Sequence, residues 1–195
     1  NFFLSCGEHP AGCAYGPANI NSILAGDAIY SAMFDNKIHL FDSLEKVCLS
    51  FMHMIRPDGE MLRIGDDYNE GTRYGSLLMT AFWGAYLYEN PVLKGFAKRE
   101  LNNFSTFYTM SFTPMHLLIF NNPEVEAAPL SDLPLVNYNG GHMGSMYARS
   151  SWTDPNAVMT YMKIGEAYAG GHQHRDNGSF QIYHKGILAS KSGHY

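Results

Sequence analysis

Residues 170–180 read Gly-Gly-His-Gln-His-Arg-Asp-Asn-Gly-Ser-Phe, and this stretch decides the fold prediction. In a β-strand, His172, His174 and Asp176 would point to one face, because successive side chains alternate between faces. Same-face neighbours lie roughly 6.6 Å apart, so two of these groups could act together in metal binding or proton transfer. A tetrahedral metal site would need ligands from a second element. Asp176 also precedes Asn177-Gly178, so its alternative interpretation is a turn former.

The segments around this stretch change character along the chain. Residues 1–16 are rich in glycine and predict a loop, and Asp66-Asp67 is interpreted as a turn. Apolar residues at helical spacing then predict helices that begin at Pro17, Asp42, about residue 74 and Pro91. Beyond a proline-rich and acidic segment, alternating residues predict strands over 143–149, 158–164, 174–183 and 187–190.

This order of elements predicts an α+β chain with more than one domain. We expect helical hairpins over 1–112, a linker or surface crossing over 113–136, and an antiparallel β domain over 137–195. The chain opens on Asn1 rather than Met and ends directly after a strand-like segment. We therefore expect it to be a piece of a longer protein.

Composition narrows the classes of function. The net charge of -5 argues weakly against a nucleic-acid partner. Three cysteines give neither a disulfide framework nor a CxxC metal knuckle, and no apolar run reaches the length of a membrane span. The sequence also lacks a Walker A loop, a dinucleotide fingerprint, a GxSxG elbow and an HExxH motif, which removes several common enzyme classes.

The last part of the chain, GGHQHRDNGSFQIYHKGILASKSGHY, resembles the start of the β-sandwich in the heparinase II/III-like polysaccharide lyases. The shared pattern is His-x-His, Asp-x-Gly-Ser-Phe, Lys-Gly and Ser-Gly-x-Tyr. The preceding helices, with RPDGEMLRIGDD in a turn, resemble the end of the α/α toroid of these enzymes. The resemblance implies an incomplete toroid followed by an incomplete sandwich.

Carried over position by position, the resemblance implies roles for individual residues. His172 matches a catalytic histidine beside the substrate uronate, and His174 matches the first ligand of a structural zinc. Tyr15, in Gly-Cys-Ala-Tyr-Gly, matches the catalytic tyrosine, and Tyr195 a tyrosine near the active site. Lys191 stands where the family has an aspartate zinc ligand, so the zinc site is altered, completed by another group such as Asp176, or empty.

Two further positions are predicted to bind substrate. Asn19 takes the place of an arginine found in some family members, and Gln173 lies between the two histidines.

The implied activity is β-elimination on a uronate-containing polymer, an acidic polysaccharide. Heparin or heparan sulfate is the first choice, and alginate or another uronan is the alternative. A non-catalytic carbohydrate-binding protein that keeps the lyase fold is the competing hypothesis. The resemblance further implies a periplasmic or secreted protein with no membrane span, which could form a homodimer.

Overall fold

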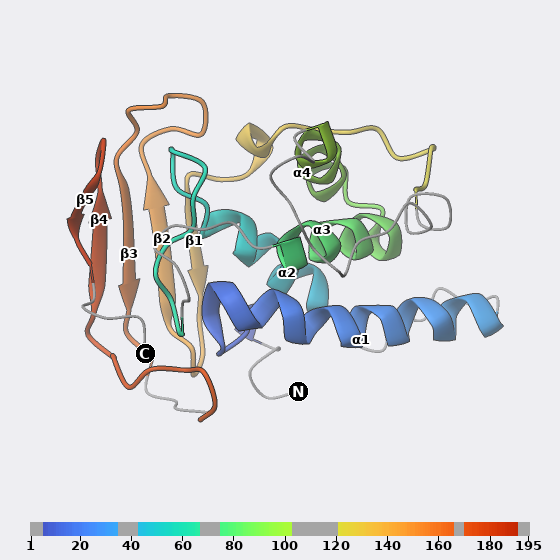
Figure 1. Ribbon diagram of the computed structural model, residues 1–195, viewed down its shortest axis with the longest axis horizontal. Coiled ribbons are helices and arrows are strands. Elements are labelled where there is room, and N and C mark those ends of the chain that lie inside the picture. Colours follow the sequence, from blue (N-terminus) through green and yellow to red (C-terminus); the bar gives the residue numbers. More distant parts are fainter. Residues whose placement is uncertain (1–5, 35–42, 67–74, 103–120, 166–169, 191–195) are drawn as a thin grey trace.

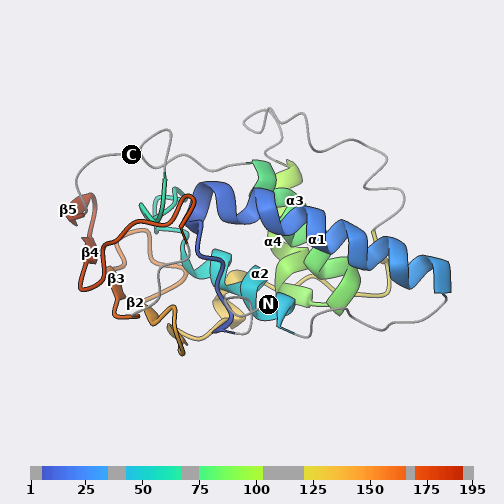
Figure 2. The same cartoon turned by 90° about the horizontal axis from the view of Figure 1, so that it is seen from below.

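A computed structural model describes residues 6–34, 43–66, 75–102, 121–165 and 170–190. These ranges contain four α-helices and one five-stranded antiparallel sheet, with the helices on one side of the molecule and the strands on the other (Figures 1 and 2). The α-helices are α1 (Gly12–Phe34), α2 (Leu44–His53), α3 (Gly75–Tyr88) and α4 (Pro91–Asn102). A 3-10 helix, η3 (Leu130–Asp132), precedes strands β1 (Val136–Asn139), β2 (Ser145–Arg149), β3 (Met159–Lys163), β4 (Phe180–Tyr183) and β5 (Ile187–Ala189).

Helix α3 lies at the centre of the helical part. Its sequence is apolar almost all round, as expected for a helix that is covered on several sides. α1 packs along one side of α3 and α4 along another, while α2 contacts α3 and the first strand. Asn90 caps α4, because its side-chain oxygen accepts hydrogen bonds from the backbone N–H groups of Val92 and Leu93, both at 3.0 Å.

The sheet is a meander in which each strand pairs with the next along the chain. Along β2 and β3, residues alternate between buried and less buried positions, as expected for a sheet with one face on a core. The inward side chains of Tyr147, Met159 and Tyr161 belong to the same buried cluster as Phe51, Leu77 and the other helical core residues. The helices and the sheet therefore share one continuous core.

A hairpin over residues 54–66 connects the helices to the sheet. Ile55 pairs with Met61 at its base, and the Leu62 N–H donates to the Met54 carbonyl at 2.8 Å. Farther along, the Arg63 N–H donates to Oε1 of Gln181 on β4, and Nε2 of Gln181 donates back to the Arg63 carbonyl. This reciprocal pair fixes the end of the hairpin against the sheet.

The structure confirms an α+β chain and corrects several predicted boundaries. Helix α1 begins at Gly12 rather than Pro17, and the Cys13 N–H donates to the Ile64 carbonyl at 3.0 Å. The strand predicted over 174–183 begins only at Phe180. Positive φ angles of 81° at Gly170 and 61° at Gly171 turn the backbone there instead of extending it. β1 was not predicted as a strand.

Candidate functional site

Asp66, at the end of the 54–66 hairpin, joins the two histidines of the 170–179 loop. Its Oδ2 lies 2.6 Å from Nδ1 of His172, and its Oδ1 lies 2.6 Å from Nε2 of His174. A carboxylate only accepts hydrogen bonds, so in the neutral imidazoles these two nitrogens carry the protons. Nε2 of His172 and Nδ1 of His174 are then the basic nitrogens. Asp66 thus sets the tautomer of both rings.

Tyr15 stacks on His172. The ring centroids are 3.5 Å apart and the planes differ by 3°. Tyr15 stands in the first turn of α1, not in the loop predicted for residues 1–16. The His172 side chain is 38% exposed, so a ligand can reach this pair from solvent. A phenol and an imidazole, both able to transfer protons, are therefore held together at the surface.

Three backbone segments meet at Gly65 and assemble this site. The Asp66 N–H donates to the His172 carbonyl at 3.1 Å. Gly65 has a φ of 72°, and a Cβ atom at this position would lie 2.8 Å from the Ala11 carbonyl oxygen and 2.9 Å from that of His172. A side chain at position 65 would force these backbone segments apart. Glycine therefore allows the start of α1, the hairpin and the histidine loop to touch.

The surroundings of Asp66 favour its charged form. Burial alone would raise the pKa of this carboxyl, but the hydrogen bonds from His172 and His174 outweigh that effect. The pKa of Asp66 consequently lies below its ordinary value of 3.8. Near neutral pH the carboxylate is ionised and can orient both imidazoles.

Asp176 does not join this cluster. It pairs instead with the Nζ of Lys163 on β3, which also donates to the His174 carbonyl at 2.9 Å. The expectation that His172, His174 and Asp176 line one face of a strand is therefore wrong, because the loop turns at Gly170 and Gly171. The two histidines still converge, through Asp66 rather than through strand geometry.

The other predicted site residues lie in different surroundings. Asn19 is exposed on α1, one helical turn beyond Tyr15 and on the same side of the helix. Gln173 is only 4% exposed, so its side chain faces away from solvent. Tyr195 and Lys191 lie outside the described residues. Of the predicted residues, the structure brings together Tyr15, His172 and His174.

The described residues do not complete the predicted zinc site. Among them, no three histidine, cysteine, aspartate or glutamate side chains are placed to hold a metal ion together. A ligating histidine commonly donates its second N–H to a carboxylate, as His174 does to Asp66, but further ligands are needed. Asp176, considered above as a substitute ligand, is paired with Lys163. Lys191 would bind zinc only after losing its proton.

A second carboxylate, Glu8, lies fully inside the molecule and is 1% exposed. It accepts hydrogen bonds from Asn139 Nδ2 and Ser145 Oγ, both at 3.0 Å, and from Tyr147 Oη at 3.1 Å. Burial raises the pKa of Glu8 above 4.5 in spite of these bonds. Glu8 ties the segment before α1 to the first two strands.

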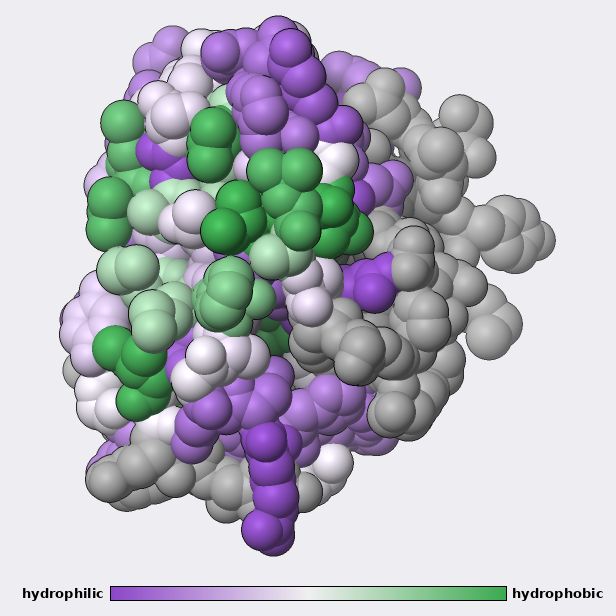
Figure 3. All heavy atoms as spheres, turned by 90° about the vertical axis from the view of Figure 1, so that its left-hand side faces the viewer, coloured by the Kyte–Doolittle hydropathy of each residue, from purple (hydrophilic) through white to green (hydrophobic). Residues whose placement is uncertain are grey.

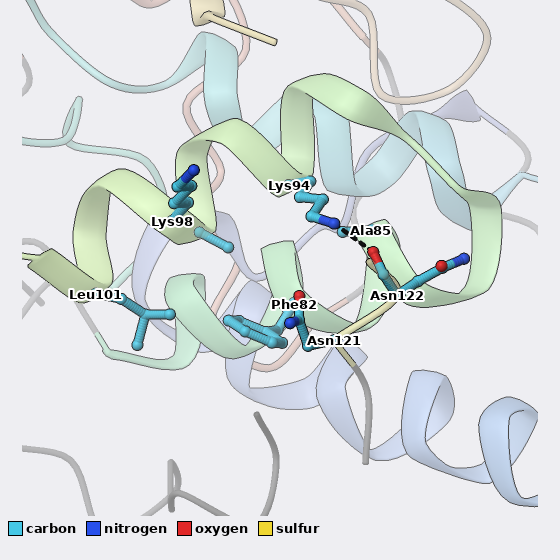
Figure 4. A pocket seen from close by; sticks show the side chains of 8 residues that line it. Phe82, Ala85, Lys94, Lys98, Leu101, Asn121 and Asn122 are labelled. Carbon is cyan, nitrogen blue, oxygen red and sulfur yellow. Dashed lines mark hydrogen bonds between the residues drawn. The ribbon is translucent and has the colours of Figure 1, made fainter. Parts of the chain in front are cut away.

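Two cavities of the described residues lie away from Tyr15 and His172. One, of about 300 Å³, lies between α3 and α4, where Phe82 and Leu101 supply apolar surface and Lys94 donates to the Asn122 carbonyl (Figure 4). The other, of about 750 Å³, is lined by α2 and β1 residues including Lys46, His53 and Tyr138. Neither contains the stacked pair, which lies in an open surface region instead.

Sequence reasoning missed Asp66 and Lys163. Asp66 contacts His172 and His174, which follow it by 106 and 108 residues, and no local sequence pattern predicts contacts over such separations. Lys163 did carry a signal. It continues the inward-facing series of Met159 and Tyr161 in a strand, where a lysine needs a buried partner.

No protein-family model and no curated protein sequence matches the chain. Among solved structures, it is similar to the heparan sulfate lyase HepC from Pedobacter heparinus, with 20% identity and a TM-score of 0.50. That similarity covers 77% of this chain and 19% of the other. A mutant of the same enzyme gives 19% identity and a TM-score of 0.49 over the same shares of the two chains. At this identity the likeness concerns the fold alone.

Proposed function

We propose that the protein is a polysaccharide lyase that cleaves a uronate-containing polymer by β-elimination. The observation that carries the proposal is the stack of Tyr15 on His172, with the His172 ring fixed by Asp66. The likeness in fold to a heparan sulfate lyase is consistent with it.

β-Elimination at a uronate needs a proton removed from C5 and a proton delivered to the departing glycosidic oxygen on C4. The C4–O bond breaks as a C4–C5 double bond forms. Tyr15 would take the C5 proton as a base and return it to the leaving oxygen as an acid. His172, whose Nε2 is the basic nitrogen, would act as second base or, once Nε2 has taken up a proton, as a donor to the substrate carboxylate.

The substrate is an acidic polysaccharide, with heparan sulfate or heparin as first choice. Asn19 is exposed on the same side of α1 as Tyr15, and in this proposal it would contact a sugar. Such a polymer is met outside the cytoplasm, so a periplasmic or secreted location belongs to the proposal. The helices of the described ranges include none that is long and apolar enough to cross a membrane.

The proposal includes the toroid and the sandwich as the wider architecture. The outer face of the sheet carries exposed apolar residues, which gather on the side of the molecule seen in Figure 3. Three of them, Tyr138, Met162 and Phe180, stand in one register row across the sheet. A second sheet packed on this face would bury them. The far end of α1 is also apolar and exposed, at Ile29, Met33 and Phe34, where further toroid helices would pack.

The test is ultraviolet absorbance of the unsaturated uronate product, followed with the purified protein on heparan sulfate, heparin, alginate and other uronans. We expect turnover on at least one polymer. Tyr15→Phe and His172→Ala should each lower kcat by roughly 10³-fold, within the range for loss of a general acid or base. Tyr30→Phe, on an exposed part of the same helix, is the matched control and should keep full activity.

Two outcomes would contradict the proposal. Absence of unsaturated product from every polymer, with binding retained, would favour the carbohydrate-binding alternative, which the lysine at position 191 also supports. Full activity of Tyr15→Phe would remove Tyr15 from the mechanism.

A further inference from the structure

Lys163 is a buried cation directly behind the histidine loop. It stands at the end of β3, and its side chain is 5% exposed. Its Nζ donates to the His174 carbonyl at 2.9 Å and to the Asp176 carboxylate. Both acceptors belong to the loop that carries His172 and His174. One ammonium therefore binds this loop at two points.

Nearby carboxyl groups stabilise the buried charge of Lys163. A buried ammonium is costly unless it is paired and hydrogen-bonded. Asp176 supplies an ion pair, and the carboxyl of Glu8 lies near enough for its charge to interact with Lys163. Movement of the loop would separate Lys163 from Asp176 and from the His174 carbonyl together, so the pairing resists that movement.

His174 links this cation to the candidate site. Its carbonyl accepts from Lys163, while its ring donates to Asp66, which also binds His172. The loop backbone is further joined to Lys163 by the Gly178 N–H, at 2.7 Å from the Lys163 carbonyl. A shift of the His174 carbonyl would therefore move its ring, and with it the carboxylate that orients His172.

We propose that Lys163 is a positioning residue that holds the histidine loop, performing with an ammonium the structural role expected of zinc. The expected effect on kcat rests on the proposed lyase function, whereas the effect of Lys163 on the position of the loop does not. The described residues do not assemble a metal site, whereas Lys163 contacts both His174, predicted as the first zinc ligand, and Asp176, considered in place of the missing aspartate ligand.

The kinetic test compares Lys163→Met with Lys163→Arg and with Lys185→Met, an exposed lysine in the turn between β4 and β5. Lys163→Met should lower kcat by about 10²-fold, the scale expected when a catalytic group is displaced by about 1 Å. KM should change little, since Lys163 is too deeply buried to bind polymer. Lys163→Arg should recover part of the loss, Lys185→Met should match the wild type, and a metal chelator should leave turnover unchanged.

A second readout does not depend on activity. The imidazole N–H protons bonded to Asp66 give downfield proton NMR signals, which Lys163→Met should shift or broaden while a chelator leaves them unchanged. If Lys163→Met does not fold, Asp176→Asn, which removes only the loop carboxylate, should produce a smaller shift of the same signals. These signals test the loop even if no polymer is cleaved.

Unchanged signals in the folded Lys163→Met protein, or in Asp176→Asn when Lys163→Met does not fold, would overturn the inference. Loss of the signals on chelation would also overturn it, because a metal would then hold the loop.

Discussion

Asp66 and Glu8 are both carboxylates that accept several hydrogen bonds, yet their environments shift their pKa values in opposite directions. Asp66 lies near the surface with two imidazole donors, and its pKa falls. Glu8 lies fully inside with amide and hydroxyl donors, and its pKa rises. The comparison shows that hydrogen bonds alone do not set the ionisation of a carboxyl. The depth of burial and the nature of the hydrogen-bond donors decide whether the pKa of the carboxyl rises or falls.

The largest expected effect is on stability, from removal of the buried carboxylate. Glu8→Ala leaves the donors of Asn139, Ser145 and Tyr147 without their acceptor, and each unmet buried group costs about 1–3 kcal/mol. We expect the free energy of unfolding to fall by about 4 kcal/mol, allowing for hydroxyls that turn to new partners. Denaturant unfolding measures this loss. A change below about 1 kcal/mol would show that the network contributes little.

Next in size is the effect of Asp66→Asn on catalysis. The amide is close in shape, but it lacks the charge, and its NH2 group cannot accept a hydrogen bond from an imidazole. We expect kcat to fall by about 10²-fold through misorientation of His172, with the fold retained by circular dichroism. Unimpaired turnover in the folded variant would show that Asp66 is not needed for the reaction and only holds the loop.

The two carboxylates should also give opposite pH dependences of stability. Asp66 has a folded pKa below 3.8, so its contribution is present above pH 3.8 and is lost as the pH falls through the folded pKa. Glu8 has a folded pKa above 4.5, so the fold loses stability as the pH rises from 4.5 toward that folded pKa.

Unfolding free energies measured across this pH range check both signs. Asp66→Asn should reduce the loss of stability in acid, and Glu8→Gln should reduce the loss on the way toward neutral pH. If the free energy of unfolding changed with pH in the same way in both variants, the two carboxyl groups would not have opposite effects.

The smallest effect is expected at Asp154, an exposed carboxylate whose Oδ1 accepts a hydrogen bond from the Asn156 N–H at 2.8 Å. Asp154→Asn keeps that acceptor, and solvent screens the lost charge. We expect the free energy of unfolding to change by less than about 0.5 kcal/mol, with turnover unchanged. A larger fall in the free energy of unfolding would mean that carboxylates stabilise this fold whether or not they are buried.

The sequence predicts much of the fold because helices and strands follow local patterns. The helices predicted near residue 74 and at Pro91 correspond to α3 and α4, and the Asn90 cap of α4 directly precedes that helix in the sequence. The start of α1 was missed because its glycines favour a loop, while the Cys13 N–H finds its partner, the Ile64 carbonyl, in the distant hairpin.

The candidate site could be predicted only in part. The spacing of His172 and His174 singled them out, but their roles, and Tyr15 itself, came from the resemblance, since histidines two residues apart do not by themselves specify a reaction. Asp66 was interpreted as a turn residue, because what brings it into the candidate site is a contact with the far end of the chain. The extended geometry assumed for 170–180 was wrong. A second element does meet the two histidines, through Asp66, but the metal site for which such an element was expected stays a prediction.

The close approach at Gly65 has a consequence for the order of folding. It brings Asp66 to a loop more than a hundred residues away, and closing so long a segment costs entropy before any contact compensates for it. The helices can form early from local contacts, whereas the pairing of Asp66 with His172 must wait for the sheet. We therefore expect catalytic competence to appear as one of the last events of folding, later than helical structure. A chain that has become helical without closing this junction would be compact but inactive.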